Sequence, residues 1–120
     1  MSHQQLLLRQ ELTVSQILRV YGKQFTQITE RYSDGRNGRC AIGVLMSYHG
    51  WSGKDDSQAS GKLLSALITL RHAGIDKNLL IDLNDSGDTF DEIADYLERN
   101  NEIRFELIES NSEDSIPYYL

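Results

Sequence analysis

The stretch of sequence that decides the fold is Leu83-Asn84-Asp85-Ser86-Gly87-Asp88-Thr89-Phe90-Asp91-Glu92-Ile93-Ala94. Its Asn-Asp-Ser-Gly segment has the composition of a tight turn. Thr89 and Glu92 stand at the spacing of a capping box, in which each side chain accepts a hydrogen bond from the other residue's backbone N–H. The stretch therefore predicts a turn that leads directly into a final helix.

The same stretch partly matches a calcium-binding EF-hand loop, whose ligands stand at positions 1, 3, 5, 7, 9 and 12. Counted from Asp82, the match fails at position 12, where Ile93 replaces the bidentate Glu and Glu92 comes one residue early. One residue moves a side chain by about 100° around a helix, away from the ion. We therefore interpret the segment as scaffolding and expect no metal or cofactor, with a calcium-responsive module over 82–92 as an alternative.

The bulk composition is that of a globular protein. A length of 120 residues fits one domain, and 39% hydrophobic and 25% charged residues are ordinary values. The apolar runs are too short to cross a bilayer, and no signal-peptide cleavage site follows Leu6-Leu7-Leu8. The single cysteine, Cys40, excludes an intrachain disulfide and a Cys-rich metal site. We expect a cytoplasmic protein without membrane contact.

Charge is distributed unevenly along the chain. Residues 1–75 carry nine Lys/Arg and five Asp/Glu, whereas residues 76–120 carry three and thirteen. This pattern predicts an acidic C-terminal surface, which is simply solvated, meets a basic protein partner or mimics nucleic acid. DNA binding is not expected, because the basic residues of the first part are scattered and their excess is modest.

Hydrophobic periodicity predicts an all-α fold, a compact bundle of four to five helices. We expect one domain over 1–108, with residues 103–108 as strand or helix, and an acidic, mobile tail over 109–120. The predicted helices are 13–32, 40–49, 58–73, 76–82 and 89–99. The expected core consists of Ile17, Leu18, Tyr21, Phe25, Val44, Leu45, Leu64, Leu67, Ile68, Leu80, Phe90, Ile93 and Leu97.

Cys40 stands where a glycine-rich loop meets the start of an apolar helix. A helix N-terminus and the neighbouring Arg39 both favour a thiolate, so the pKa of this thiol is expected to be lowered. A thiol nucleophile also needs a base, and His49 lies about 13 Å further along the same helix, which leaves His72. A thiol-dependent enzyme is therefore an alternative, but a small buried residue is the simpler interpretation, and no catalytic residue is assigned.

Two segments carry recognisable motifs. Gly38-Arg39-Cys40-Ala41-Ile42-Gly43-Val44-Leu45 has the pattern CxxGxL, and residues 83–98 have the pattern LNDxGxxFxEIADxxE. Together they resemble a group of small proteins of unknown function that includes many phage and prophage proteins, and more weakly some actinobacterial proteins. Members often have two adjacent cysteines where this chain has Cys40-Ala41. The resemblance implies that both segments pack together as one structural motif, which comprises Cys40, Gly43, Asn84, Asp85, Gly87, Thr89 and Glu92.

Physical chemistry gives this motif a specific contact. The helix that begins at Cys40 leaves up to four backbone N–H groups without partners inside the helix. We expect Asn84 or Asp85 to cap this helix start, with Arg39 as a charged partner, and Gly43 to let another helix approach closely. For function, the sequence favours a non-enzymatic interaction or accessory protein that uses its acidic C-terminal surface on a protein partner, and the resemblance adds the expectation of a phage-type protein.

Overall fold

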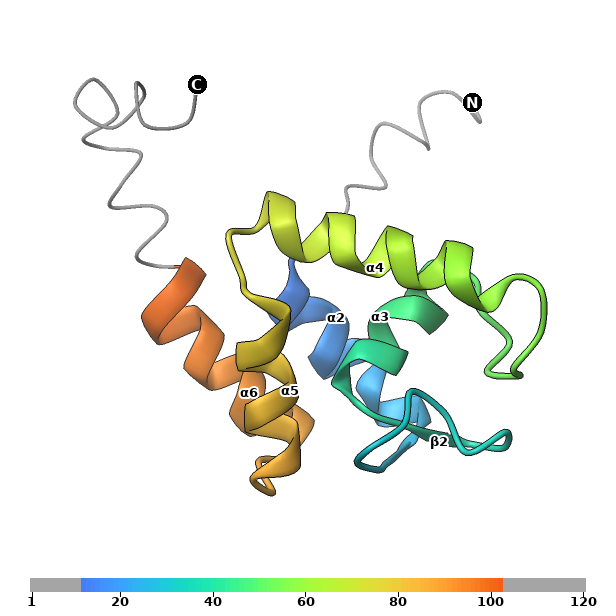
Figure 1. Ribbon diagram of the computed structural model, residues 1–120. Helices are drawn as coiled ribbons and strands as arrows, with labels where there is room; N and C mark the ends of the chain where they lie inside the picture. Colours follow the sequence, from blue (N-terminus) through green and yellow to red (C-terminus); the bar gives the residue numbers. More distant parts are fainter. Residues whose placement is uncertain (1–11, 103–120) are drawn as a thin grey trace, which may run out of the picture.

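The computed structural model describes residues 12–102 and contains five α-helices in that range, which confirms the predicted all-α fold (Figure 1). They are α2 (Val14–Val20), α3 (Ala41–Tyr48), α4 (Ala59–His72), α5 (Lys77–Asp85) and α6 (Phe90–Leu97). The predictions for 103–108 and for the tail over 109–120 lie outside the described residues. Within 12–102, no helix has the length and apolar character needed to cross a bilayer.

The helices surround one hydrophobic core. Figure 1 shows α4 lying across α2 and α3, with α5 and α6 near the C-terminal end of α4. Helix α6 packs on α2, while α3 packs on α2, α4 and α5. The centre is formed by side chains without solvent exposure, among them Ile17, Leu18, Leu45, Ile93 and Leu97. Helix α3 is therefore the element that the rest of the fold encloses.

The predicted long helix over 13–32 is wrong. Helix α2 ends at Val20, a short 3-10 turn follows at Gly22–Gln24, and Thr26–Gln27 forms the strand β1. β1 pairs in parallel with β2 (Gly38–Arg39). Gly22 weakens helical continuation, and a Cβ at this position would lie 2.7 Å from Cδ2 of Phe90. The chain therefore leaves the helix at the point where α6 must approach closely.

Helix α5 is longer than predicted, because it ends at Asp85 rather than at residue 82. Its end is a Schellman motif, in which Asp88 N–H donates to Leu83 O and Gly87 N–H donates to Asn84 O, both at 3.2 Å. Gly87 has the required left-handed backbone, with φ of 101°. The turn is thus Ser86-Gly87-Asp88, and Asn84 and Asp85 belong to the helix.

The predicted helix starts are confirmed in detail. Thr89 and Glu92 form both hydrogen bonds of a capping box at the start of α6, and Thr13 and Gln16 do the same for α2. Cys40 is the N-cap of α3, where its sulfur accepts a hydrogen bond from Gly43 N–H at 3.5 Å.

Helix α4 corrects two core predictions, since Leu64 is 59% exposed and Ile68 is 46% exposed. The apolar residues of this helix are spread over more than one face, and a helix on the surface buries only one of them. Ala66 and Leu70 are the residues that α4 buries completely.

Candidate functional site: an acidic cleft at Cys40

Asn84 joins the two segments that the sequence analysis paired. Its Oδ1 accepts a hydrogen bond from Ala41 N–H, the first residue of α3, at 3.1 Å, and its Nδ2 donates to Ile28 O at 2.9 Å. The side chain is buried, with 2% exposure. The expected contact between α5 and the start of α3 is therefore present, and Asn84 makes it rather than Asp85.

Gln27 completes this contact, and the sequence analysis missed it because the residue was placed inside a helix. Its Nε2 donates to Asn84 Oδ1 at 2.9 Å and to Asp88 O at 2.7 Å, and its Oε1 accepts from Phe90 N–H at 3.1 Å. We call Gln27 and Asn84 the amide pair. Through it, β1 is fixed to the start of α3, the end of α5 and the start of α6.

Gly43 makes a different close approach from the expected one. A Cβ at this position would overlap the backbone carbonyl oxygen of Tyr32, which belongs to the loop after β1 and not to a helix. The same carbonyl accepts a hydrogen bond from Cys40 N–H at 3.4 Å. The glycine thus lets the loop of residues 29–35 lie directly on the first turn of α3.

Arg39 does not act as the charged partner of Asn84 or Asp85. Its guanidinium donates to the hydroxyls of Ser47 at 2.9 Å and Ser33 at 3.1 Å, and to the carbonyl of Ser52 at 3.2 Å. It also lies over the rings of Phe25 and Trp51, at 4.5 and 5.6 Å from their centroids. This buried cation therefore holds the loops on both sides of α3 in place.

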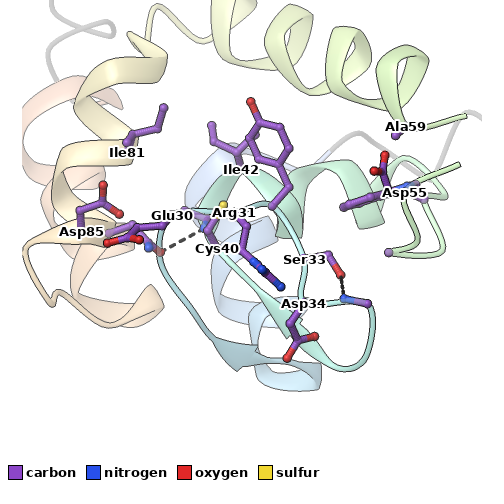
Figure 2. Close-up of a pocket in the computed structure, with 16 residues that line it drawn as sticks. Glu30, Arg31, Ser33, Asp34, Cys40, Ile42, Asp55, Ala59, Ile81 and Asp85 are labelled. Atoms are coloured by element: carbon purple, nitrogen blue, oxygen red, sulfur yellow. Dashed lines mark hydrogen bonds between the residues drawn. The ribbon is translucent and has the colours of Figure 1, made fainter.

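These contacts leave a cavity of about 800 Å³ above the start of α3, the Cys40 cleft (Figure 2). This volume is that of a site for a small-molecule or short peptide ligand. Its lining residues are Glu30, Arg31, Tyr32, Ser33, Asp34, Gly35, Cys40, Ala41, Ile42, Trp51, Gly53, Asp55, Ala59, Ile81, Asn84 and Asp85.

The rim of the cleft is acidic and its interior is partly apolar. Four carboxylate side chains, those of Glu30, Asp34, Asp55 and Asp85, line the cleft together with one guanidinium, that of Arg31. Backbone N–H groups of Arg36 and Gly38 donate to Asp34, which lowers the pKa of this carboxyl group. Sequence reasoning identified only Asp85 of these four, because the other three stand in loops without a recognisable motif.

Two of the four carboxylates occupy unfavourable positions. Glu30 has φ of 71°, a left-handed conformation that costs free energy for any residue other than glycine. Asp85 is in the last turn of α5, where the negative end of the helix dipole opposes a carboxylate. Among residues 12–102 the salt bridges are all made by Arg19, so neither carboxylate is compensated by an ion pair there.

Cys40 lies in this cleft but lacks the environment of a catalytic thiol. Burial raises its pKa, which outweighs the hydrogen bonds from Gly43 and Ile42, and Asp85 raises it further. The expected lowering is therefore wrong. His49 contacts Thr69 Oγ1 at 2.8 Å, and neither His49 nor His72 lines the cleft.

Thiol labelling can measure the electrostatic potential in the cleft, since Cys40 is the only cysteine of the chain. We expect a cationic methanethiosulfonate reagent to modify the folded protein about tenfold faster than its anionic analogue, because the carboxylates concentrate cations. In urea the two rates should converge. Equal rates in the folded protein would contradict an acidic field at Cys40.

The segment over 82–92 does not have the geometry of a calcium-binding loop. Asp82 and Asn84, which would be its first ligands, lie on helix α5, and Asn84 Oδ1 already accepts two hydrogen bonds. Within the described part of the chain, no group of three His, Cys, Asp or Glu side chains is arranged to hold a metal ion.

No family model, curated protein or solved structure matches this chain. The resemblance of residues 38–45 and 83–98 to phage and actinobacterial proteins therefore stays a prediction.

Proposed function

We propose that this chain is a non-enzymatic accessory protein, of the phage type that the resemblance implies, whose Cys40 cleft binds a basic segment of a protein partner. The observation that carries the proposal is the cleft itself, which four carboxylates and one guanidinium line together with apolar side chains. A lysine or arginine side chain combines a cationic end with an apolar stem, so it complements both parts of such a cleft.

Two of the acidic residues lower the stability of the free protein, and this supports a binding role. Glu30 holds a strained backbone and Asp85 opposes a helix dipole, and both side chains line the same cavity. Such costs cluster where a ligand later compensates them, because selection for stability alone would remove them. Neutralising Asp85 should accordingly leave the stability unchanged or slightly raised.

The acidic residues of α6, together with Glu98 directly after it, are a weaker candidate for the partner surface. Asp91, Asp95 and Glu98 surround Arg19 of α2, with oxygen–nitrogen distances of 3.7, 2.5 and 2.9 Å. This arrangement lowers the pKa of Glu98 through its hydrogen bonds with Arg19. These carboxylates serve the contact between α2 and α6, whereas those of the cleft have no such partner among residues 12–102.

A peptide titration tests the proposal. Trp51 lines the cleft and is the only tryptophan of the chain, so its fluorescence reports occupation. We expect a capped Lys-Leu-Lys peptide to bind with a Kd below about 1 mM, which corresponds to roughly 4 kcal/mol. The affinity should fall when NaCl is raised from about 0.02 to about 0.3 M, because salt screens exposed charges.

Two variants make the test specific. Asp85→Asn should weaken binding about three- to fivefold, the size expected for one exposed charge pair. Asp82→Asn removes the same charge from the same helix outside the cleft and should change the affinity less than twofold. A capped Glu-Leu-Glu peptide that binds as well as Lys-Leu-Lys, or equal effects of both variants, would contradict the proposal.

A further inference from the structure

We infer that the Cys40 cleft recognises a three-residue pattern, two basic residues that bracket one apolar residue in an extended segment. This inference rests on the proposed function and specifies its partner. A cleft that only attracted positive charge would need neither separated carboxylates nor an apolar centre, and the structure has both.

Three of the four carboxylates stand at opposite ends of the cleft. Figure 2 shows Asp85 and Glu30 on the side of α5, and Asp55 on the other side, in the loop that precedes α4. All three side chains are exposed. One lysine or arginine side chain reaches one of these ends, so a ligand that satisfies both ends carries two cationic groups.

The region between the two ends contains apolar side chains beside the guanidinium of Arg31. Ile42 lies between Asp85 and Asp55 in Figure 2, and Ile81 and Ala59 line the walls from α5 and α4. Ile81 and Asp85 are four residues apart on α5 and so share one face of the helix. The stem of a basic residue can pack on Ile81 while its charge reaches Asp85, which leaves the centre to a neighbouring apolar side chain.

The geometry of a strand fits this order of residues. In an extended peptide, residues one and three point to the same side, and each residue advances the chain by about 3.3 Å. The middle residue points to the opposite side and can face the centre of the cleft. The long flexible stems of the two basic residues can then bend back to the two rims. The volume of about 800 Å³ accommodates a segment of this size.

Titrating a set of peptides into a set of protein variants tests the pattern, with Trp51 fluorescence as the readout. The capped peptides are Lys-Leu-Lys, Lys-Ser-Lys, Ser-Leu-Lys and Lys-Leu-Ser, and each is titrated into the unchanged protein, Asp55→Asn and Asp85→Asn. We expect the Leu-to-Ser change to weaken binding at least fivefold and each Lys-to-Ser change about three- to fivefold. In Asp85→Asn, one of the two lysines should lose its effect; in Asp55→Asn, the other lysine should.

The outcomes separate this inference from the proposed function. Lys-Leu-Lys can bind while the Leu-to-Ser change leaves the affinity unchanged, or both protein variants can abolish the contribution of the same lysine. In either case the cleft binds basic segments without recognising the pattern. The inference is then overturned and the proposed function is not. If none of the basic peptides binds, both the inference and the proposed function are overturned. Melting temperatures of Asp55→Asn and Asp85→Asn within about 2 °C of the unchanged protein exclude misfolding as the cause.

Discussion

Replacing Gly43 with alanine is expected to destabilise the protein by about 3 kcal/mol or more. In most helices a Gly-to-Ala change is stabilising, by about 1 kcal/mol, because alanine has the higher helix propensity. Here the added Cβ would overlap the carbonyl oxygen of Tyr32 and approach Arg39 Cδ to 3.3 Å. Backbone cannot move aside as a flexible side chain can, so the loop of residues 29–35 would be displaced from α3.

Gly61→Ala is the matched control. Gly61 is in helix α4, and nothing lies within 4 Å of the Cβ that the substitution adds. This variant should be more stable than the unchanged protein by about 0.5–1 kcal/mol. Urea unfolding followed by Trp51 fluorescence measures both variants. The same sign of effect in both would contradict the close contact between the loop and α3.

Replacing Asn84 with alanine should destabilise the protein by about 3–4 kcal/mol. The change leaves Ala41 N–H, the Gln27 amide and Ile28 O without the partner that Asn84 provides. Each lost hydrogen bond that leaves a buried polar group unpaired costs about 1–3 kcal/mol, and some of these groups regain water. The cleft should also lose its shape, because Asn84 lines it and holds the start of α3.

Two further substitutions check the origin of this effect. Asn78→Ala removes an exposed amide from the same helix and should change the free energy of unfolding by less than about 0.5 kcal/mol. Asn84→Asp keeps the acceptor but replaces the donor that faces Ile28 O with a carboxylate oxygen, so it should also be strongly destabilising. A mild effect of Asn84→Ala, close to that of Asn78→Ala, would show that the amide pair contributes little.

The sequence predicted helices where short-range chemistry determines them. Helix α6 begins where Thr89 and Glu92 form a capping box, and α3 begins directly after its N-cap Cys40, which follows a glycine-rich loop. The error over 13–32 has a long-range cause, since the chain turns at Gly22 to accommodate Phe90 of α6. Periodicity was uninformative there, because a stripe of apolar residues at helical spacing also arises when an extended segment packs against a core.

Of the cleft, only the contact between Asn84 and the start of α3 could be predicted from the sequence. The pairing of Cys40 with Asn84 came from the two related segments, and unpaired N–H groups at a helix start required an acceptor. Glu30, Asp34 and Asp55 enter the cleft through loops, whose path depends on tertiary contacts such as those of Arg39. A sequence shows no local signal for such contacts.

The amide pair also has a consequence for folding, because it joins segments that are far apart along the chain. Its hydrogen bonds join residues 43, 57 and 61 positions apart along the chain. During synthesis, β1 and the first turn of α3 leave the ribosome long before Asn84 does, and their polar groups are bound by water until then. Closing such large loops is slow, and the stabilising contacts form only once all segments are present. We therefore expect that the first half of the protein does not fold stably before the second half has been synthesised. Folding is then a single late cooperative event.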